Sequence, residues 1–321
     1  MVVIVVAVAS FLACFGSMPW LIERLRKREF VGADVNKPDR PLVPNIGGFA
    51  VFFGLACSTL FALCLAAVGG TLHVDTIPTL AAFSCIALVA FIGVFDDLFA
   101  LPPPIKGTLP VFAAIPLIVT HQGSGEVSFP LLGSIDFGAA YALLLIPLGV
   151  TGAANVTNML AGFNGTEAGM GAVACFGLGL IALLTGRGES AVILFGMLGA
   201  LVAFLYYNWY PARVFIGDTG TLTIGAVLAS SVIIGRYEVA GMIVIIPYAV
   251  DFVIKAWNRF PSTNWWGTWV DGRLTHTGRP LGLGQTIMLV TGGVSERNLT
   301  LILIGMEAVA ALVAVLLFAR A

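Results

Sequence analysis

An aspartate with glycines on both sides stands in a short polar connection between two long apolar runs. The connection is residues 208–220, and it places Asp218 between Gly217 and Gly220. Glycines next to a carboxylate let a phosphate-bound cation come close to the backbone. A polar turn between two membrane helices would have a similar composition, so this stretch alone leaves both interpretations open.

Two adjacent carboxylates, Asp96 and Asp97, close an earlier apolar run, and Lys106 follows nine residues after Asp97. Neighbouring carboxylates at a membrane boundary repel each other and are costly to desolvate, so a bound cation or a role as a base would explain them. The prolines at 102–104 stiffen the connection and can fix where Lys106 points, and lysine is a usual point-charge partner of phosphate. A solvated helix end is the alternative.

The segment 155–169 is the richest in side chains that could bind a ligand. Its asparagines and glycines are Asn155, Asn158, Asn164, Gly162, Gly165 and Gly169. Asparagine carbonyls are neutral oxygen ligands and hydrogen-bond partners for a base or a sugar, and glycine allows close backbone approach. A simple turn is the alternative, which the density of polar side chains beside apolar helices disfavours.

The long connection at 255–297 combines tryptophans with basic residues. Its indoles predict contact with the membrane interface; they are Trp257, Trp265, Trp266 and Trp269. Its cations could instead clamp a diphosphate; they are Arg259, Arg273, His276 and Arg279.

Two acids fall within apolar runs, where ionisable residues are functional candidates by default. Asp251 lies near a helix end and could simply be solvated, whereas no role suggests itself for Glu307. The five cysteines form no CxxC pair and no cluster with histidine, so neither a disulfide framework nor a zinc site is expected.

These polar stretches require a membrane-embedded framework. The 321 residues are 59% hydrophobic and 10% charged, with a mean hydropathy of +0.99, whereas soluble domains carry roughly 25% charged residues. The sequence predicts an all-α polytopic membrane protein with ten spans and one integral-membrane domain over 1–321. The expected spans lie at 1–21, 47–68, 77–95, 108–121, 137–155, 168–185, 190–207, 219–235, 239–256 and 298–319, and prolines interrupt the short one at 108–121.

The distribution of positive charge predicts the orientation of these spans. Of the 16 Lys and Arg, alternate connections place three on one side, namely Arg187, Arg236 and Arg320, and the rest on the other. The positive-inside rule assigns the richer side to the cytoplasm and both termini to the outside. Nearly all the unusual polar residues then lie on the cytoplasmic face.

In this order, the polar stretches resemble the polyprenyl-phosphate N-acetylhexosamine-1-phosphate transferase family. The resemblance is greatest to its archaeal and eukaryotic branch, which makes dolichyl-diphospho-N-acetylglucosamine at the first step of N-glycosylation. The stretches span nearly the whole chain: Gly32-Ala-Asp-Val-Asn-Lys37, Phe95-Asp-Asp97 with Lys106, residues 155–169, residues 208–219 and Ser295-Glu-Arg-Asn-Leu-Thr300. The last of them favours the dolichol branch over the bacterial cell-wall branch.

The resemblance implies a reaction and a set of partners. A UDP-N-acetylhexosamine would donate sugar-1-phosphate to a polyprenyl or dolichyl phosphate, releasing UMP, with Mg²⁺ (or Mn²⁺) as cofactor. The protein would be a homodimer in the cell membrane of an archaeon or bacterium, with a cytoplasmic site and no nucleic-acid partner.

The resemblance also implies roles for individual residues. Asp218 would be the main Mg²⁺ ligand with Asn158 as its partner, Lys106 would contact the diphosphate, and Asp96 and Asp97 would lie beside the lipid phosphate. The remaining substrate contacts would come from Asn45, Asn155, Gly162, Asn164 and Phe215, of which Gly162, Asn164 and Phe215 would shape the uridine pocket.

One departure from the family pattern leaves the sugar and the diphosphate clamp open. The family carries a compact Arg/His-rich motif in its last cytoplasmic loop, where this chain has residues 261–266 without it. Arg273, His276 and Arg279 follow later and are the expected substitutes.

Two alternatives to the dolichol-type enzyme remain at this stage. A bacterial-type enzyme would use undecaprenyl phosphate in cell-envelope polysaccharide synthesis. A secondary transporter would place polar groups near the midplane, often with an inverted repeat, whereas the polar groups here cluster at one face and no repeat is visible.

Overall fold

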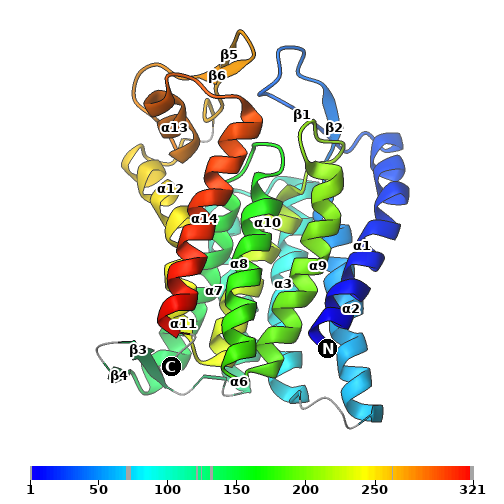
Figure 1. Cartoon of the computed structure of the whole chain (residues 1–321), viewed down its shortest axis with the longest axis vertical. Coiled ribbons are helices and arrows are strands. Elements are labelled where there is room, and N and C mark those ends of the chain that lie inside the picture. The colour runs from blue at the N-terminus through cyan, green and yellow to red at the C-terminus, as the bar shows by residue number, and fades with distance from the viewer. Residues whose placement is uncertain are drawn as a thin grey trace.

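The structure is a computed structural model that describes residues 2–69, 74–120, 122–123, 125–130, 133–261 and 263–318. It is an elongated helix bundle with short hairpins at both ends (Figure 1). The helices are α1 Val2–Lys27, α2 Gly48–Gly69, α3 Thr76–Phe99, α4 Pro103–Thr108, α5 Pro110–Ala113, α6 Ile115–Val119, α7 Ile146–Met159, α8 Thr166–Leu184, α9 Gly188–Asn208, α10 Gly217–Gly235, α11 Glu238–Val244, α12 Ile246–Trp257, α13 Leu283–Thr291 and α14 Glu296–Phe318. A π-helical turn, Tyr141–Leu145, leads into α7.

Three antiparallel hairpins add a small β content to the predicted all-α fold. They pair β1 Val31–Ala33 with β2 Leu42–Pro44, β3 Glu126–Phe129 with β4 Gly133–Asp136, and β5 Thr268–Val270 with β6 Arg273–Thr275. Each lies in a connection rather than in the bundle, so the helical core is as predicted (Figure 1).

The predicted count of ten spans is not matched by ten long helices. Among the described residues, eight helices are long and apolar enough to cross a membrane, and nine if α11 and α12, bent by 60° at Ile245, count as one span. The expected span at 108–121 is the exception. It falls in a shorter helical stretch, Pro103–Val119, that breaks into α4, α5 and α6, because Pro110 and Pro116 cannot donate the backbone hydrogen bonds of a continuous helix.

The chain still runs between the two ends of the bundle at this point. α3 ends beside the start of α10, and α6 lies at the opposite end (Figure 1). A 17-residue helix would measure about 25 Å, shorter than a hydrocarbon core of about 30 Å. The short stretch therefore joins the same two ends that the long helices join.

The core of the bundle is formed by α8, α9 and α10, the most deeply buried of the spans. α10 packs against both α3 and α7, which carry the candidate residues. Contact with α3 is close because a Cβ on Gly93 would lie 2.6 Å from the Cα of Thr219. Glycine thus sets the distance between the two helices that bear Asp97 and Asp218.

One end of the bundle gathers the connections that the sequence singled out. The β1–β2 hairpin, the α3–α4 turn and the connections after α7, α9 and α12 all lie there, at the top of Figure 1. Arg187 and Arg236 lie at the opposite end, between α8 and α9 and between α10 and α11. The predicted division of positive charge between two ends is thus confirmed for these residues, while Arg320 lies outside the described residues.

Candidate active site

The two adjacent carboxylates at the end of α3 have different partners. Asp96 is buried; its Oδ2 lies 2.5 Å from the Lys106 Nζ, and its Oδ1 accepts the Leu101 N–H. Asp97 instead accepts the backbone N–H groups of Asp218 and Thr219 at 2.8 and 2.9 Å, and the Thr219 hydroxyl at 2.6 Å. Because both carboxylates have protein partners, the alternative that they mark a solvated helix end is wrong.

Asp97 therefore stabilises the start of α10 from outside that helix. The first N–H groups of a helix lack intrahelical partners and favour a nearby negative charge. Gly217 makes the approach possible, since its φ is +69° and a Cβ there would lie 2.7 Å from the Asp97 carboxylate. Gly217 was predicted to let a cation come close to the backbone. In the structure it lets the Asp97 carboxylate come close to the backbone.

The Asp218 side chain contacts both Lys106 and Asn158. The Lys106 Nζ lies 2.8 Å from the Asp218 Oδ2 and so bridges Asp218 and Asp96. The Asn158 side-chain amide donates to the Asp218 Oδ1 and, at 2.8 Å, to the Thr221 hydroxyl. Residues from α3, α4, α7 and α10 thus converge, although 122 positions separate Asp96 from Asp218.

Two neighbouring carboxylates keep the Lys106 amine protonated. Burial lowers the pKa of this lysine, but the neighbouring carboxylates of Asp218 and Asp96 outweigh burial and raise the pKa above its usual range. Lys106 is therefore a fixed positive charge at neutral pH, suited to an anionic ligand.

The donor chemistry of this wall fits Mg²⁺. Asp218 keeps about a third of its side chain exposed, and the carboxamide oxygen of Asn158 is a second hard ligand once the amide turns. Among the described ranges there is no group of three or more His, Cys, Asp or Glu placed to hold a metal. Mg²⁺ commonly binds through one or two carboxylates together with substrate phosphates and water, so the predicted pair Asp218 and Asn158 is compatible with such a site.

A cavity of about 340 Å³ opens beside Asp218 and Asn158. Its other walls include the predicted uridine-pocket residues Gly162, Asn164 and Phe215, together with Trp265. Gly162 has φ +115°, and a Cβ there would lie 2.1 Å from the Trp265 ring. The cavity, called the donor cavity below, thus has a polar wall and an aromatic wall, a combination suited to a nucleotide sugar.

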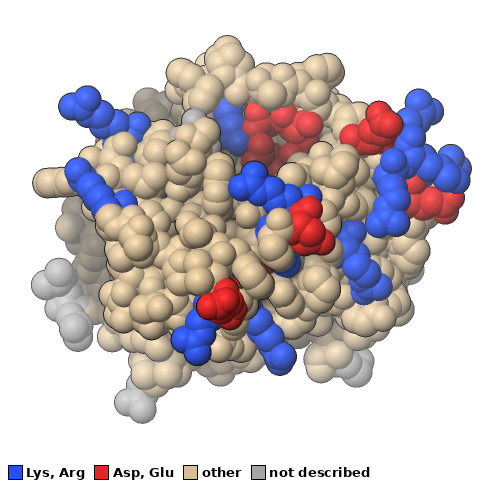
Figure 2. Space-filling view, turned by 90° about the horizontal axis from the view of Figure 1, so that it is seen from above, with Lys and Arg blue, Asp and Glu red and all other residues tan. Residues whose placement is uncertain are grey.

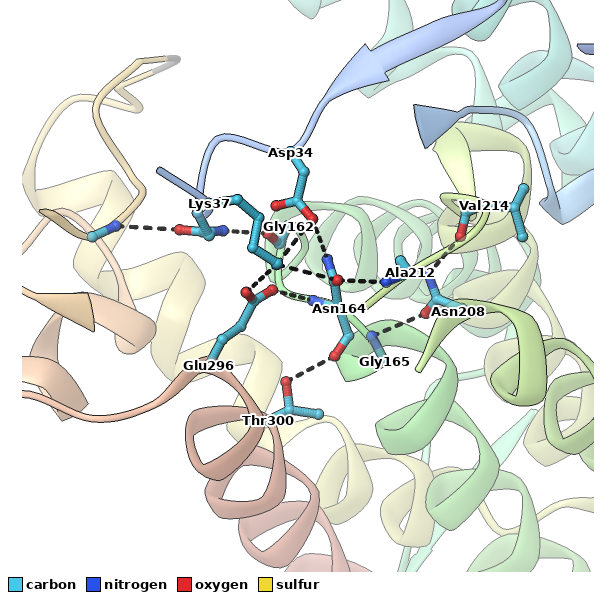
Figure 3. Close-up of polar contacts among 12 residues, drawn as sticks. Asp34, Lys37, Gly162, Asn164, Gly165, Asn208, Ala212, Val214, Glu296 and Thr300 are labelled. Atoms are coloured by element: carbon cyan, nitrogen blue, oxygen red, sulfur yellow. Dashed lines mark hydrogen bonds and ion pairs between the residues drawn. The ribbon is translucent and has the colours of Figure 1, made fainter. Parts of the chain in front are cut away.

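Asn164 is the centre of a buried network rather than a free ligand group (Figure 3). Its side-chain oxygen accepts from the Ala212 N–H at 2.8 Å and from Lys37, while its side-chain NH₂ donates to Asp34 at 3.1 Å. Its backbone N–H donates to Glu296 at 2.8 Å, and its carbonyl accepts from the Thr300 hydroxyl at 3.0 Å. Through its side chain and backbone, Asn164 therefore joins its own loop to the β1–β2 hairpin, to the α9–α10 connection and to the start of α14.

Lys37 joins the first and last of the stretches that carry the family resemblance. Its ammonium pairs with Asp34 at 2.9 Å and with Glu296, and all three side chains are buried (Figure 3). Asn36 adds a bond from its side-chain NH₂ to the Gly162 carbonyl at 2.9 Å. These two stretches thus act as a frame for the loop that holds Gly162.

The other predicted site residues fall into two groups. Asn155 lies close to the wall but donates to the carbonyls of Gly107 and Thr151, and so fixes the turn that carries Lys106. The lining of the donor cavity does not include Asn45, Arg273, His276 or Arg279. His276 instead lies within hydrogen-bond distance of the Arg279 carbonyl on the exposed surface, so a diphosphate clamp from these residues stays a prediction.

Sequence reasoning missed the pair Asp251 and Lys255 as part of this site. Asp251 is buried, its Oδ1 accepts the Leu283 N–H, and its Oδ2 lies 2.8 Å from the Lys255 Nζ, so the idea that it is merely solvated is wrong. Lys255 also donates to the Met159 carbonyl and lines the donor cavity. The i,i+4 spacing of an acid and a lysine at a helix end was the available signal.

The surface at the top end of the bundle carries both basic and acidic side chains (Figure 2). In Figure 2, basic side chains project around the rim, and a group of acidic side chains lies in a recess beside a basic one. A rim of positive charge around a recess attracts anions by long-range electrostatics.

Comparison with known proteins identifies the family of this site. Residues 79–236, which include most of α3 and all of α7 and α10, match the model of glycosyl transferase family 4. A Saccharolobus solfataricus protein, provisionally named a UDP-N-acetylglucosamine–dolichyl-phosphate N-acetylglucosaminephosphotransferase, is 36% identical over 310 residues, covering 96% of this chain and 94% of its own length. The chain belongs to glycosyl transferase family 4.

Other relatives span both branches of glycosyl transferase family 4. A Sulfolobus acidocaldarius protein with the same provisional name is 31% identical over 96% of this chain and 94% of its own length. A phospho-N-acetylmuramoyl-pentapeptide-transferase of Halalkalibacterium halodurans is 30% identical over 63% of both chains. The chain is therefore a multi-pass membrane enzyme of the polyprenyl-phosphate sugar-1-phosphate transferase class, and the transporter alternative is set aside.

Proposed function

We propose that this protein transfers N-acetylglucosamine-1-phosphate, or a related N-acetylhexosamine-1-phosphate, from the UDP-sugar to a polyprenyl phosphate of the dolichyl type. The observation that carries the proposal is that Asp218 and Asn158 contact each other on the wall of the donor cavity, while Lys106 pairs with Asp218 from outside that lining and with Asp96. The two relatives with provisional dolichyl-phosphate names support the lipid and the sugar. The reaction would be the first membrane step of N-glycan assembly, on the cytoplasmic face.

The donor would lie with its diphosphate against the polar wall and its uracil toward the aromatic wall. Asp218 and Asn158 would hold Mg²⁺, which when bound neutralises charge on the phosphates of the leaving UMP. Lys106 would contact the same diphosphate as a fixed positive charge. Phe215 and Trp265 offer apolar surface beside Gly162, where backbone can approach a planar base.

The acceptor would bind where α7 leads away from the polar wall. An apolar cavity of about 400 Å³, called the lipid groove below, lies between α7, α10 and the bent pair α11–α12. Its α7 lining runs from Ile146 to Val156, two residues before Asn158. A polyprenyl chain in the lipid groove would place its phosphate near Asp96 and Lys106.

In the reaction, an oxygen of the lipid phosphate attacks the sugar-bearing phosphorus in line. The new P–O bond forms as the bond to the bridging oxygen of UMP breaks, and UMP leaves with that oxygen and its electron pair. The second pKa of a phosphate monoester is about 6, so much of the lipid phosphate is already dianionic at neutral pH and a strong base is not required. Asp96 would orient Lys106, and the role of Asp97 as a base remains a prediction.

A donor and acceptor screen tests the proposal. The purified protein would be given UDP-N-acetylglucosamine or UDP-N-acetylgalactosamine with dolichyl or undecaprenyl phosphate, and UMP release would be measured together with the mass of the lipid product. We expect UMP release only when a lipid phosphate is present, and the highest rate with UDP-N-acetylglucosamine and dolichyl phosphate. A clear preference for undecaprenyl phosphate would assign the chain to the bacterial-type reaction instead.

A further inference from the structure

A second polar cavity lies at the end of the bundle opposite to the donor cavity. It measures about 420 Å³ and is bounded by the β3–β4 hairpin, the α8–α9 connection and the end of α14. Its polar lining includes Ser128, Ser134, Arg187 and Arg236. The helices α8, α9 and α10 run between the two cavities, so this one cannot belong to the donor cavity.

Positive charge in this cavity is concentrated and incompletely paired. Only three Lys or Arg fall on this side of the predicted topology, and Arg187 and Arg236 both line the cavity. The Arg187 guanidinium lies over the Tyr237 ring at 4.9 Å, while its Nη1 is buried and has no hydrogen-bond partner in the described part of the chain. A buried donor without a partner is costly, so Arg187 is suited to an anionic ligand that would occupy it.

The buried carboxylate of Glu238 interacts by charge with both arginines. Glu238 contributes a favourable charge interaction to Arg187 and accepts the Tyr141 hydroxyl. Burial lowers the pKa of Arg187, and the charge of Arg236 acts in the same direction. Glu238 is thus shared between the two guanidiniums, and the Arg187 Nη1 keeps no hydrogen-bond partner among the described residues.

The rest of the lining suits a phosphate carried on an apolar body. Ser128 and Ser134 are paired across the hairpin, so their side chains share one face and both reach the cavity. Guanidinium and hydroxyl groups together are typical donors to phosphate oxygens. Phe129 and Phe318 add apolar surface, and the cavity lies where α8, α9 and α10 end, at the depth expected for lipid headgroups.

We propose that this cavity binds the phosphate headgroup of a membrane lipid, with Arg187 and Arg236 as its main contacts. The lipid would be held at the far end of the bundle from the transferase chemistry, so it is neither donor nor acceptor. The proposal does not depend on which sugar or polyprenyl phosphate the enzyme uses.

Lipid binding by matched variants of the purified full-length chain tests the proposal. Native mass spectrometry and thermal unfolding would follow binding of phosphatidylglycerol to the delipidated protein, with sodium phosphate and sodium chloride of equal ionic strength as separate arms. The test variant is Arg236→Gln, because Arg236 is exposed and its replacement should leave folding intact. Arg40→Gln is the control, since Arg40 is also an exposed arginine with positive φ but lies at the other end.

We expect phosphatidylglycerol to raise the unfolding temperature of the wild type and of Arg40→Gln. Arg236→Gln should weaken binding about tenfold, as for loss of one charge-assisted contact, and Arg187→Gln/Arg236→Gln should abolish it while UMP release continues. An equal effect of sodium phosphate without lipid would make the ligand free phosphate and overturn the lipid assignment. Lipid binding that is absent, or that is the same in the double variant as in the wild type, would overturn the site itself.

Discussion

At the scale of single residues, Asp96 and Asp97 show how neighbours in sequence acquire separate tasks. Successive residues on a helix point about 100° apart, so Asp96 faces Lys106 while Asp97 faces the start of α10. Their importance could be predicted from the cost of two carboxylates at a membrane boundary. Their partners could not, because these depend on how α3 is rotated against α4 and α10.

Asp218 is the residue on which the proposed chemistry depends most. Asp218→Asn should lower kcat by about 10²–10³-fold, since it removes the negative ligand for Mg²⁺ that compensates charge on the leaving group. UMP release would be measured against Mg²⁺ concentration. Asp271→Asn, an identical change at an exposed position, should leave the rate unchanged. Wild-type turnover of Asp218→Asn would remove Asp218 as the metal ligand.

The raised pKa of Lys106 leads to a prediction about how stability depends on pH. Because Asp218 and Asp96 raise its pKa in the folded state, the stabilising effect of its charge is complete below the ordinary lysine pKa of about 10.4. That effect should be lost as the pH rises through the higher folded value. The difference in unfolding temperature between the wild type and Lys106→Gln should therefore be constant from pH 7 to 9 and shrink only in strongly alkaline buffer. A difference that already fades near neutrality would show that Lys106 titrates there.

At the scale of elements, the start of α10 depends on a side chain from another helix. Asp97 supplies three acceptor contacts to the first turn of α10, and Gly217 leaves room for them. The sequence identified both residues as functional candidates but gave no sign that they contact each other. An aspartate that caps a helix from 121 positions away leaves no local pattern.

Replacing Asp97 separates capping from catalysis. Asp97→Asn should destabilise the fold by about 1–2 kcal/mol, the usual effect of losing a helix cap, and lower kcat less than tenfold, since both carboxylate oxygens already serve α10. Thermal unfolding and UMP release per folded molecule would be measured together. Thr219→Val, which removes only the hydroxyl contact, should show a smaller loss of stability. An unchanged unfolding temperature with a kcat reduced a hundredfold or more would instead establish Asp97 as the base.

The frame around Asn164 is the second element-scale feature. Lys37 and Glu296 come from stretches near the two ends of the chain, and each bonds to Asn164 (Figure 3). The resemblance marked both stretches, and the polar segment 155–169 was expected to bind a ligand directly. In the structure, the polar groups of Asn164 bond within the protein and hold this loop in place. Fewer polar groups of the segment 155–169 are therefore available to a ligand in the donor cavity than expected.

Removing the charge of Lys37 should be far more costly than removing an exposed one. Lys37→Met leaves Asp34 and Glu296 buried without a counter-charge, which should destabilise the protein by about 3–5 kcal/mol and raise the KM for the UDP-sugar. Lys27→Met is the matched control, because Lys27 pairs with Glu23 on the exposed surface of α1. We expect the control to unfold at the wild-type temperature, and equal effects of the two changes would rule out the frame.

At the scale of the whole molecule, composition and charge predicted the architecture better than they predicted the number of helices. Apolar runs predicted the membrane bundle, and the basic residues within the described ranges lie at its two ends as expected, because both properties follow from solvation along a single axis. The expected ten exceeds the eight or nine long helices of the described residues because prolines break the stretch Pro103–Val119 into short pieces. The bend between α11 and α12 likewise falls within a run that hydropathy treats as one helix.

The lipid groove makes a prediction for the acceptor. Gly152 lines the groove, and a Cβ there would have no atom within 4 Å, so Gly152→Leu would fill the groove without a clash at its Cβ. We expect a higher KM for the polyprenyl phosphate and an unchanged KM for the UDP-sugar. Gly305→Leu on α14 is a matched control, since Gly305 is equally unobstructed but lies outside the groove. Equal acceptor kinetics in both variants would exclude the groove as the lipid site.

The position of the chain ends has a practical consequence for assays. The helix α1 begins and the helix α14 ends toward the end of the bundle opposite to the start of α10 (Figure 1), and a 21-residue helix such as α9 spans about 30 Å between the two ends. A reporter protein or an immobilising tag fused at either terminus would therefore leave the donor cavity open. Phe318 borders the arginine-lined cavity, so an amino-terminal fusion is the better choice whenever bound lipid is to be counted.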